Sequence, residues 1–206
     1  SFVMLDFKNL FRALKNYNYR LFFIGQSLSL VGTWMQQIAL SWLVYRMTNS
    51  PFLLGVVGFA GQVPTFFLSP LAGILADRYP KRKILVITQF VALLQASLLA
   101  FLVLTNQIAV WQIISLSILL GFVNGFDMPI RQAFTIEMVD DKNDLSNAIA
   151  LNSSIVNLAR LIGPSIAGIL IATVGEGICF FVNAFSYVPV IFCLLAMRIK
   201  ARKAQL

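Results

Sequence analysis

Between Arg20 and Arg46 the sequence runs for 25 residues without a charged side chain. Five further stretches of comparable apolarity follow along the chain. A helix of about 20 apolar residues crosses the roughly 30 Å hydrocarbon core of a bilayer, and it satisfies every backbone N–H and C=O group within its own segment. The pattern therefore predicts an all-α protein that spans a lipid bilayer several times.

The charge-free stretches predict six membrane-crossing helices joined by short loops. The long uncharged stretch 84–126 is divided at Thr105–Gln107, and the last two spans are divided at Gly175–Gly177, because polar residues and glycine favour a turn. A content of 59% hydrophobic residues without strand-like alternation fits this class. The predicted spans are 21–45, 52–76, 84–104, 108–130, 146–174 and 177–197.

The positions of the cations explain the formal net charge of +8. Of the 16 Lys and Arg residues, 14 lie before the first span, between spans two and three, between spans four and five, or after span six. Arg46 lies in an opposite loop and Arg160 lies inside a span. The positive-inside rule then places both termini in the cytoplasm, so the basic residues orient the chain and do not indicate a nucleic-acid partner.

Three regions follow from this topology. Residues 1–19 are predicted to be a cytoplasmic amphipathic segment, with a helix over 6–16 lying at the membrane interface. Residues 20–200 form the six-helix bundle, and residues 201–206 begin a cytoplasmic linker. The first span is too long for the apolar core of a signal peptide, and no small-residue cleavage pattern follows it.

Polar side chains line one face of the first span at spacings of 3, 4 and 4 residues: Gln26, Ser29, Thr33 and Gln37. Such a stripe faces other helices or water and does not face lipid. Two interpretations stay open, interhelical hydrogen bonding and the lining of a cavity. The stripe is about 17 Å long by helical rise, which favours the cavity slightly.

Charged and amide side chains also occur in spans four and five. Asn124, Asp127 and Arg131 share one helical face, so Asp127 either pairs locally with Arg131 or acts as the titratable carboxylate of a proton-coupled carrier. Arg160, near Asn157, lies about 21 Å beyond the predicted start of its span. Asp127 is its candidate partner, although the difference in depth counts against a direct bond; without a partner, Arg160 is interpreted as an anion site.

Gly163-Pro164 and Gly168 predict a kink with a close helix approach nearby, which is either plain packing or a gate. The strings 70–76 and 164–170 are similar and fall in spans two and five, which are equivalent positions if spans 1–3 and 4–6 are inverted repeats.

The loop after span two carries the string Gly73-Ile-Leu-Ala-Asp77-Arg78-Tyr-Pro-Lys81-Arg82-Lys. This string resembles the cytoplasmic loop signature of the major facilitator superfamily, from which it departs at Pro80 and Lys81. Residues 159–168 resemble the antiporter-type signature of that family. Residues 125–134 and 157–161 are similar to its branch that contains the bacterial enterobactin exporter.

The resemblance covers residues from about 20 to 200 and implies the N-terminal half of a twelve-span transporter, built as two inverted three-helix repeats. The C-terminal half would then be missing from this chain and would be its partner. By position, the resemblance implies that Asp77 caps a helix of that half. It also implies that Lys81 or Arg82 pairs with Glu137 at the cytoplasmic end of span four.

We therefore expect a secondary transporter of a bacterial cytoplasmic membrane that exports a small organic molecule by alternating access and proton antiport. Siderophores, hydrophobic drugs and macrolide-like molecules all fit an aromatic and amide-lined cavity. The alternative is a membrane assembly or regulatory protein without transport activity.

An enzyme, a metal site and a cofactor are not predicted. The chain has no His, no phosphate-binding loop and no H-E-x-x-H or G-x-S-x-G motif. Cys179 and Cys193 lie about 21 Å apart on one predicted helix, which excludes a disulfide between them and suggests packing thiols.

Overall fold

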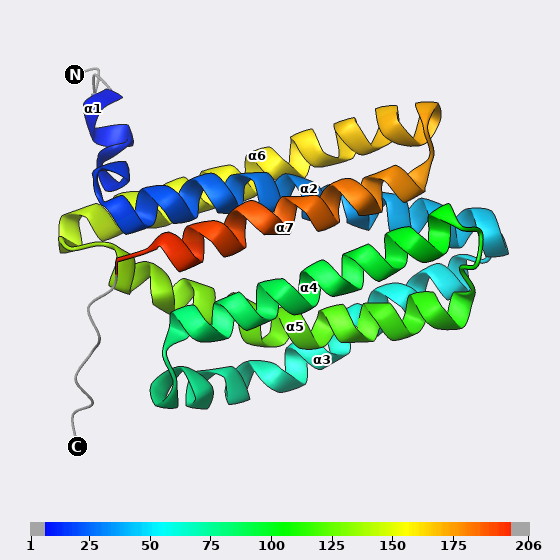
Figure 1. Cartoon of the computed structure of the whole chain (residues 1–206), viewed down its shortest axis with the longest axis horizontal. Coiled ribbons are helices and arrows are strands. Elements are labelled where there is room, and N and C mark those ends of the chain that lie inside the picture. The colour runs from blue at the N-terminus through cyan, green and yellow to red at the C-terminus, as the bar shows by residue number, and fades with distance from the viewer. Residues whose placement is uncertain (1–6, 199–206) are drawn as a thin grey trace.

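The computed structural model describes residues 7–198, and every regular element in this range is a helix. Two short helical turns precede six long helices that run side by side along the long dimension of the molecule (Figure 1). This confirms the all-α prediction. The elements are α1 (Phe7–Leu10), η1 (Arg12–Lys15), α2 (Tyr17–Thr48), α3 (Pro51–Arg78), α4 (Lys81–Leu104), α5 (Val110–Met138), α6 (Lys142–Thr173) and α7 (Glu176–Ala196).

Five of the long helices, α3 to α7, are long and apolar enough to cross a membrane. The chain is accordingly an integral membrane protein. The sixth, α2, corresponds to the first predicted span but is more polar than the others. Its Gln26, Ser29 and Gln36 side chains are buried against neighbouring helices, so its lower hydropathy arises in part from residues that contact protein.

Local signals set the helix boundaries. Ser50 caps the start of α3 by accepting a hydrogen bond from the backbone N–H of Leu53 at 3.2 Å, and Pro51 occupies the first helical position. Gly175, at φ +91°, separates α6 from α7. The largest departure from the predicted spans is in α5, which continues to Met138 although the predicted span ends at 130. The charges of its last two turns lie at the end of the bundle and do not interrupt the helix.

The prediction of one amphipathic helix over residues 6–16 is wrong for its described part. Residues 7–15 form two separate short turns, α1 and η1. Arg12 forms an ion pair with Asp144 at 2.6 Å, and the backbone N–H of Ala13 donates to Asn147 Oδ1 at 2.7 Å. Polar contacts with the start of α6 therefore break the segment and hold it against the bundle.

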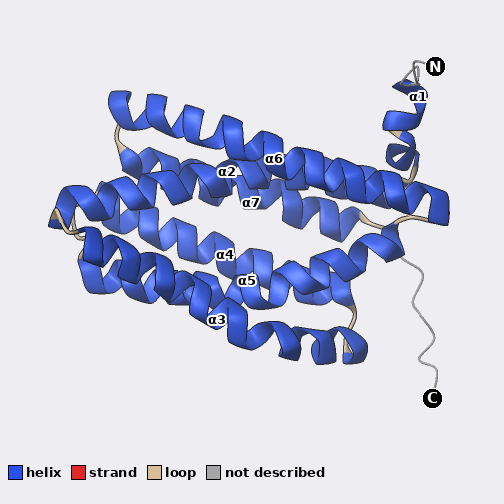
Figure 2. Cartoon of the chain, turned by 180° about the vertical axis from the view of Figure 1, so that it is seen from behind, coloured by secondary structure: helices blue, strands red, loops and turns tan. Residues whose placement is uncertain are grey.

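The outer positions of the bundle belong to α3 and α6, which lie at opposite edges in both views (Figures 1 and 2). α3 packs mainly against α5 and α6 mainly against α2, while α4 and α7 pack against each other and against α5 and α2 respectively. The outer helices bury few residues: Val57, Pro64 and Ala72 in α3, and Ala148, Ala159, Gly163 and Ala167 in α6. Most of their surface is therefore open to lipid or to another protein.

Candidate functional site

Asp127 lies in α5, and three donors from two helices hold its carboxylate. Arg131 Nε donates to Oδ2 at 2.9 Å, one turn along the same helix. The hydroxyl of Thr88 and the amide of Gln89, both on α4, donate to Oδ1 at 2.7 and 2.8 Å. Asp127 is 6% exposed, and Asn124, one turn earlier, is half-buried. The local Asp127–Arg131 pair, one of the two interpretations of the sequence, is thus present.

A second buried polar cluster joins four helices and includes residues that the sequence analysis did not select. Asn183 of α7 donates to Gln36 Oε1 at 2.6 Å, and Gln36 Nε2 of α2 donates to Gln95 Oε1 of α4 at 3.3 Å. Gln95 in turn donates to the backbone carbonyl of Leu116 in α5 at 3.2 Å. All three amide side chains are at most 3% exposed. The sequence could have indicated this cluster, because amide side chains in the middle of three spans tend to hydrogen-bond across helices.

The predicted polar stripe of α2 divides into a buried and an exposed part. Gln26 and Ser29 are each 5% exposed, and Thr33 is half-buried and donates to its own helix at Ser29 O, 2.9 Å away. Gln37 is exposed and makes no side-chain hydrogen bond within the described residues. Gln36, its neighbour in sequence, makes the interhelical contacts instead. The stripe is thus buried at Gln26 and Ser29 and exposed at Gln37.

Arg160 is exposed near the middle of α6, and its guanidinium lies over the ring of Trp34 in α2, 5.1 Å from the ring centroid. Gly163 makes this approach possible: a Cβ atom there would lie 2.6 Å from Trp34 Cβ and 2.9 Å from Val31 O. None of the ion pairs in residues 7–198 includes Arg160. Asp127 pairs with Arg131, so it is not the partner of Arg160.

The other small residues selected from the sequence occupy open positions. Pro164 lies inside the continuous helix α6. A Cβ atom added at Gly168 or Gly73 would meet nothing within 4 Å. The close approach predicted at Gly168 is therefore wrong, because α6 meets α2 on the face that carries Gly163.

In the cytoplasmic loop signature, Lys81 Nζ donates to Glu137 Oε1 at 2.7 Å and joins the start of α4 to the end of α5. Arg82 points elsewhere and donates to the carbonyl of Met197, just after α7, at 2.7 Å. Asp77 and Arg78 are exposed at the end of α3. Two basic residues of the loop thus connect three helix ends.

The exit from α7 has a further set of contacts. Asn18 Nδ2 donates to Arg198 O at 3.0 Å, and the N–H of Arg198 donates back to Asn18 Oδ1 at 2.8 Å. The guanidinium of Arg198 lies 4.7 Å from the ring centroid of Tyr17. The start of α2 and the loop residue Arg82 therefore hold the last turn of α7 from two sides.

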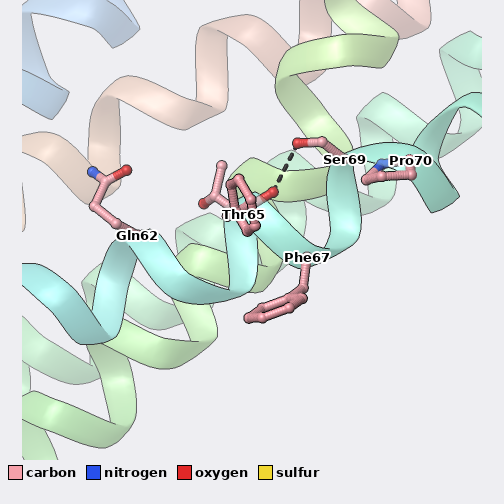
Figure 3. A pocket seen from close by; sticks show the side chains of 6 residues that line it. Gln62, Thr65, Phe67, Ser69 and Pro70 are labelled. Atoms are coloured by element: carbon pink, nitrogen blue, oxygen red, sulfur yellow. Dashed lines mark hydrogen bonds between the residues drawn. The ribbon is translucent and has the colours of Figure 1, made fainter.

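A concavity of about 710 Å³ lies along α3, and none of its lining residues was selected as a site residue from the sequence. Gln62, Thr65 and Ser69 lie along one side of the helix and Phe67 points away from them (Figure 3). Ser69 donates to Thr65 O at 2.7 Å. Only α3 contributes to the lining, so the concavity is open. The sequence analysis treated this span as uniformly apolar. The spacing of three and four residues between Gln62, Thr65 and Ser69 could have indicated a polar face.

The described residues contain no group of three or more His, Cys, Asp or Glu side chains that could hold a metal ion. Cys179 and Cys193 are free thiols, the first buried and the second half-buried.

The long apolar helices, with buried amides and an arginine inside one of them, make this a polytopic membrane protein. Comparison with known sequences gives the family. Residues 9–206 match the transmembrane secretion effector family of the major facilitator superfamily, and the chain belongs to that family. The related proteins are transporters of this superfamily and not enzymes.

Three relatives illustrate the match. The chain is 32% identical over 183 residues to the staphyloferrin A transporter of Staphylococcus aureus, covering 88% of this chain and 46% of that protein. It is 25% identical over 171 residues to the multidrug efflux pump Tap of Mycolicibacterium fortuitum, covering 81% and 42%. It is 26% identical over 157 residues to the enterobactin exporter EntS of Shigella boydii, covering 76% and 38%. The chain thus spans less than half the length of these relatives.

Proposed function

We propose that these residues form one half of a secondary transporter that exports a small organic molecule, of the siderophore or drug type, from a bacterium. The observation that carries this proposal is the polar surface that α2 and α6 leave open at membrane depth. Three polar side chains are exposed there: Gln37, Asn157 and Arg160. Against lipid, an apolar side chain at each of these positions would be more favourable in free energy. A second bundle of the same carrier, with a substrate cavity between the two halves, would give these side chains a polar environment.

The expected topology has six crossings with both termini cytoplasmic. α2 lies alongside α6 and α7 over most of its length (Figures 1 and 2), which supports its crossing despite its polarity. Cysteine labelling in a C179A/C193A background tests the orientation. An impermeant thiol reagent added to whole cells should label N106C, in the α4–α5 loop, and not K83C at the start of α4; the reverse pattern contradicts the assignment.

The helix contacts support two inverted three-helix repeats, α2–α4 and α5–α7. α3 packs on α5 as α6 packs on α2, and α2 packs on α7 as α5 packs on α4. Exchanging α2 with α5, α3 with α6, and α4 with α7 therefore returns the same set of main contacts. Pro70 and Pro164 lie inside the two outer helices that this exchange relates.

Within this carrier, the residues that face the polar opening form the substrate pathway, and Asp127 carries the coupling proton. Gln37, Asn157 and Arg160 are exposed at this opening. Behind them, Gln26 is buried in the bundle, and Thr33 and Asn124 are half-buried. The three donors that hold the Asp127 carboxylate come from α4 and α5, so a movement of either helix would change its hydrogen bonds. Transfer of the proton and release of the substrate would in this way be coupled through α4 and α5.

The cytoplasmic loop acts as the gate in this proposal. Asp77 is exposed at the end of α3, where it would contact a helix of the second half, and Lys81 with Glu137 fixes the loop on the first half. Replacing Asp77 by Asn in the full-length protein should reduce efflux several-fold without lowering expression. A contact of about 1 kcal/mol at a helix end is enough to shift a two-state equilibrium by several-fold. Normal efflux by D77N would exclude the gate.

Inside-out vesicles containing the full-length protein test the function itself. The compounds are ethidium, erythromycin and the organic acid dansyl-phenylalanine; at least one should accumulate when a proton gradient is imposed, and nigericin should abolish the accumulation. The D127N variant should lose gradient-driven accumulation and keep downhill exchange, whereas residues 1–206 alone should transport none of the three. If the full-length protein moves none of the three under a gradient, and membrane integrity controls are normal, the exporter proposal fails and the alternative, an assembly or regulatory protein, replaces it.

A further inference from the structure

Arg160 lies about 27 Å along α6 from its start, and Trp34 lies about 26 Å along α2 from its start. Both helices have 32 residues, so the two side chains meet near the midpoint of the bundle. A guanidinium at this depth is costly unless it faces protein, water or an anion. Its position is therefore explained by a function that needs a positive charge at the centre of the carrier.

The acidic residues of the described chain leave this charge without a counterion. Asp127 is held by Arg131, and Glu176 is held by Arg46 at the opposite end of the bundle. Every other acid of residues 7–198 lies at or near the cytoplasmic ends of the helices: Asp77, Glu137, Asp140, Asp141 and Asp144. A negative charge beside Arg160 must come from outside these residues.

The contact with Trp34 leaves the donors of the guanidinium available. The Cζ atom of Arg160 lies over the ring of Trp34, 5.1 Å from the ring centroid. None of the five N–H donors makes a hydrogen bond to the residues that the structure describes. A guanidinium with free donors can bind the two oxygens of a carboxylate through two parallel hydrogen bonds. Gln37, on the same face of α2 as Trp34, is exposed with its amide groups free.

From this geometry we propose that Arg160, which lies over the ring of Trp34, binds an anionic carboxylate group of the exported molecule, with Gln37 one turn further along α2. The inference rests on the proposed export function and names the substrate class: an organic acid with an apolar or aromatic part that can lie against the open surfaces of α2 and α6. The phosphate of an anionic lipid headgroup offers the same negative charge, so the test includes that source.

The test uses the full-length protein in nanodiscs of phosphatidylcholine and two matched fluorescent probes, dansyl-phenylalanine and its carboxamide. The acid should bind at least about tenfold more tightly than the amide, since a charge-assisted hydrogen bond contributes about 1.5 to 3 kcal/mol. R160Q should remove this preference. R160K should retain part of it, because lysine keeps the charge and loses the planar fork. W34F should retain most of it, and W34A should weaken it.

R20Q is the matched control, because Arg20 is also an exposed arginine and lies at the cytoplasmic start of α2. Its preference for the acid should equal that of the unchanged protein. Adding phosphatidylglycerol to the nanodiscs separates the two sources of the anion. If phosphatidylglycerol weakens binding of the acid probe, and this competition is lost in R160Q, a lipid headgroup is the occupant and the substrate assignment is overturned. Binding of the acid that phosphatidylglycerol does not change supports the assignment.

Two results overturn the inference and leave the export function intact. One is equal or absent binding of the two probes by a protein that still accumulates ethidium under a proton gradient. The other is a loss of thermal stability in R160Q with an unchanged acid preference, which would show that an acid elsewhere in the full-length protein pairs with Arg160. If ethidium, erythromycin and dansyl-phenylalanine all fail to accumulate, the export proposal itself has failed.

Discussion

Asp127 and Arg160 are both charged residues of the bundle, but their surroundings differ. Asp127 is 6% exposed and accepts hydrogen bonds from Arg131, Thr88 and Gln89, whereas Arg160 is exposed and its guanidinium lies over the ring of Trp34. The comparison shows that a charge in a membrane span can be neutralised within one bundle or left available to something beyond it. The first kind should affect stability and the second should affect binding.

The largest expected effect on stability is the removal of the Asp127 carboxylate. D127L would leave the Arg131 guanidinium and the Gln89 amide without their shared acceptor, and we expect a loss of about 2 to 4 kcal/mol in the free energy of unfolding. Denaturation of the full-length protein in detergent, followed by circular dichroism, measures it. The double variant D127L/R131M should recover a substantial part of the loss. R160M should change stability by less than about 1 kcal/mol; if it destabilises as much as D127L, the comparison is wrong.

A second test uses two adjacent glutamines of α2. Gln36 is 3% exposed and hydrogen-bonded to Asn183 and Gln95, and Gln37 is exposed. Q36L would remove one hydrogen-bond partner from each of two buried amides, Asn183 and Gln95, and should lower stability by about 1 to 3 kcal/mol. Q37L should be nearly neutral for stability and should instead alter probe binding. The same unfolding measurement compares the two variants, and equal losses would contradict the division of the stripe into buried and exposed parts.

Much of the fold could be predicted from the sequence because the bilayer makes helix formation the dominant local requirement. Runs without charges located all six long helices, and charges at loop positions such as Arg78 and Lys142 indicated where spans end. The failure at residues 6–16 has a physical cause. Amphipathic spacing was sufficient to suggest a helix, but Asp144 and Asn147 compete for Arg12 and for the backbone of Ala13.

The site was predicted less completely. Spacing along one helix identified the Asp127–Arg131 pair, because both partners belong to α5. It could not identify Trp34 as the neighbour of Arg160, nor Asn183 as the partner of Gln36, because these pairs join segments more than 100 residues apart. It also selected Gln37 in preference to Gln36, since a one-residue step on a helix changes the face by about 100° and the neighbouring helices were unknown.

A third prediction concerns the approach of α6 to α2, which brings Arg160 to Trp34. G163A would place a Cβ atom 2.6 Å from Trp34 Cβ and 2.9 Å from Val31 O, so the helices must separate. We expect a stability loss of about 1 to 2 kcal/mol and weaker preference for the acid probe. G168A adds a methyl group to open space and should be neutral or slightly stabilising, by up to about 1 kcal/mol. Thermal unfolding and probe binding of both variants provide the test; equal effects would rule out the proposed contact.

The smallest expected effect on stability concerns the Lys81–Glu137 ion pair, which joins α4 to α5 near the end of the bundle. Lys81 and Glu137 have side chains that are 14% and 28% exposed, so solvent screens their attraction more than it does at Asp127. K81M should therefore lower the free energy of unfolding by no more than about 1 kcal/mol, and the difference should shrink in high salt. A double-mutant cycle with E137Q, measured at low and high salt, isolates the pair.

The proposed gate adds a further requirement: K81M should reduce efflux more than its small stability loss accounts for, because it would free the loop that carries Asp77. A stability loss of several kcal/mol that does not change with salt would instead make this pair part of the structural core, like Asp127 and Arg131.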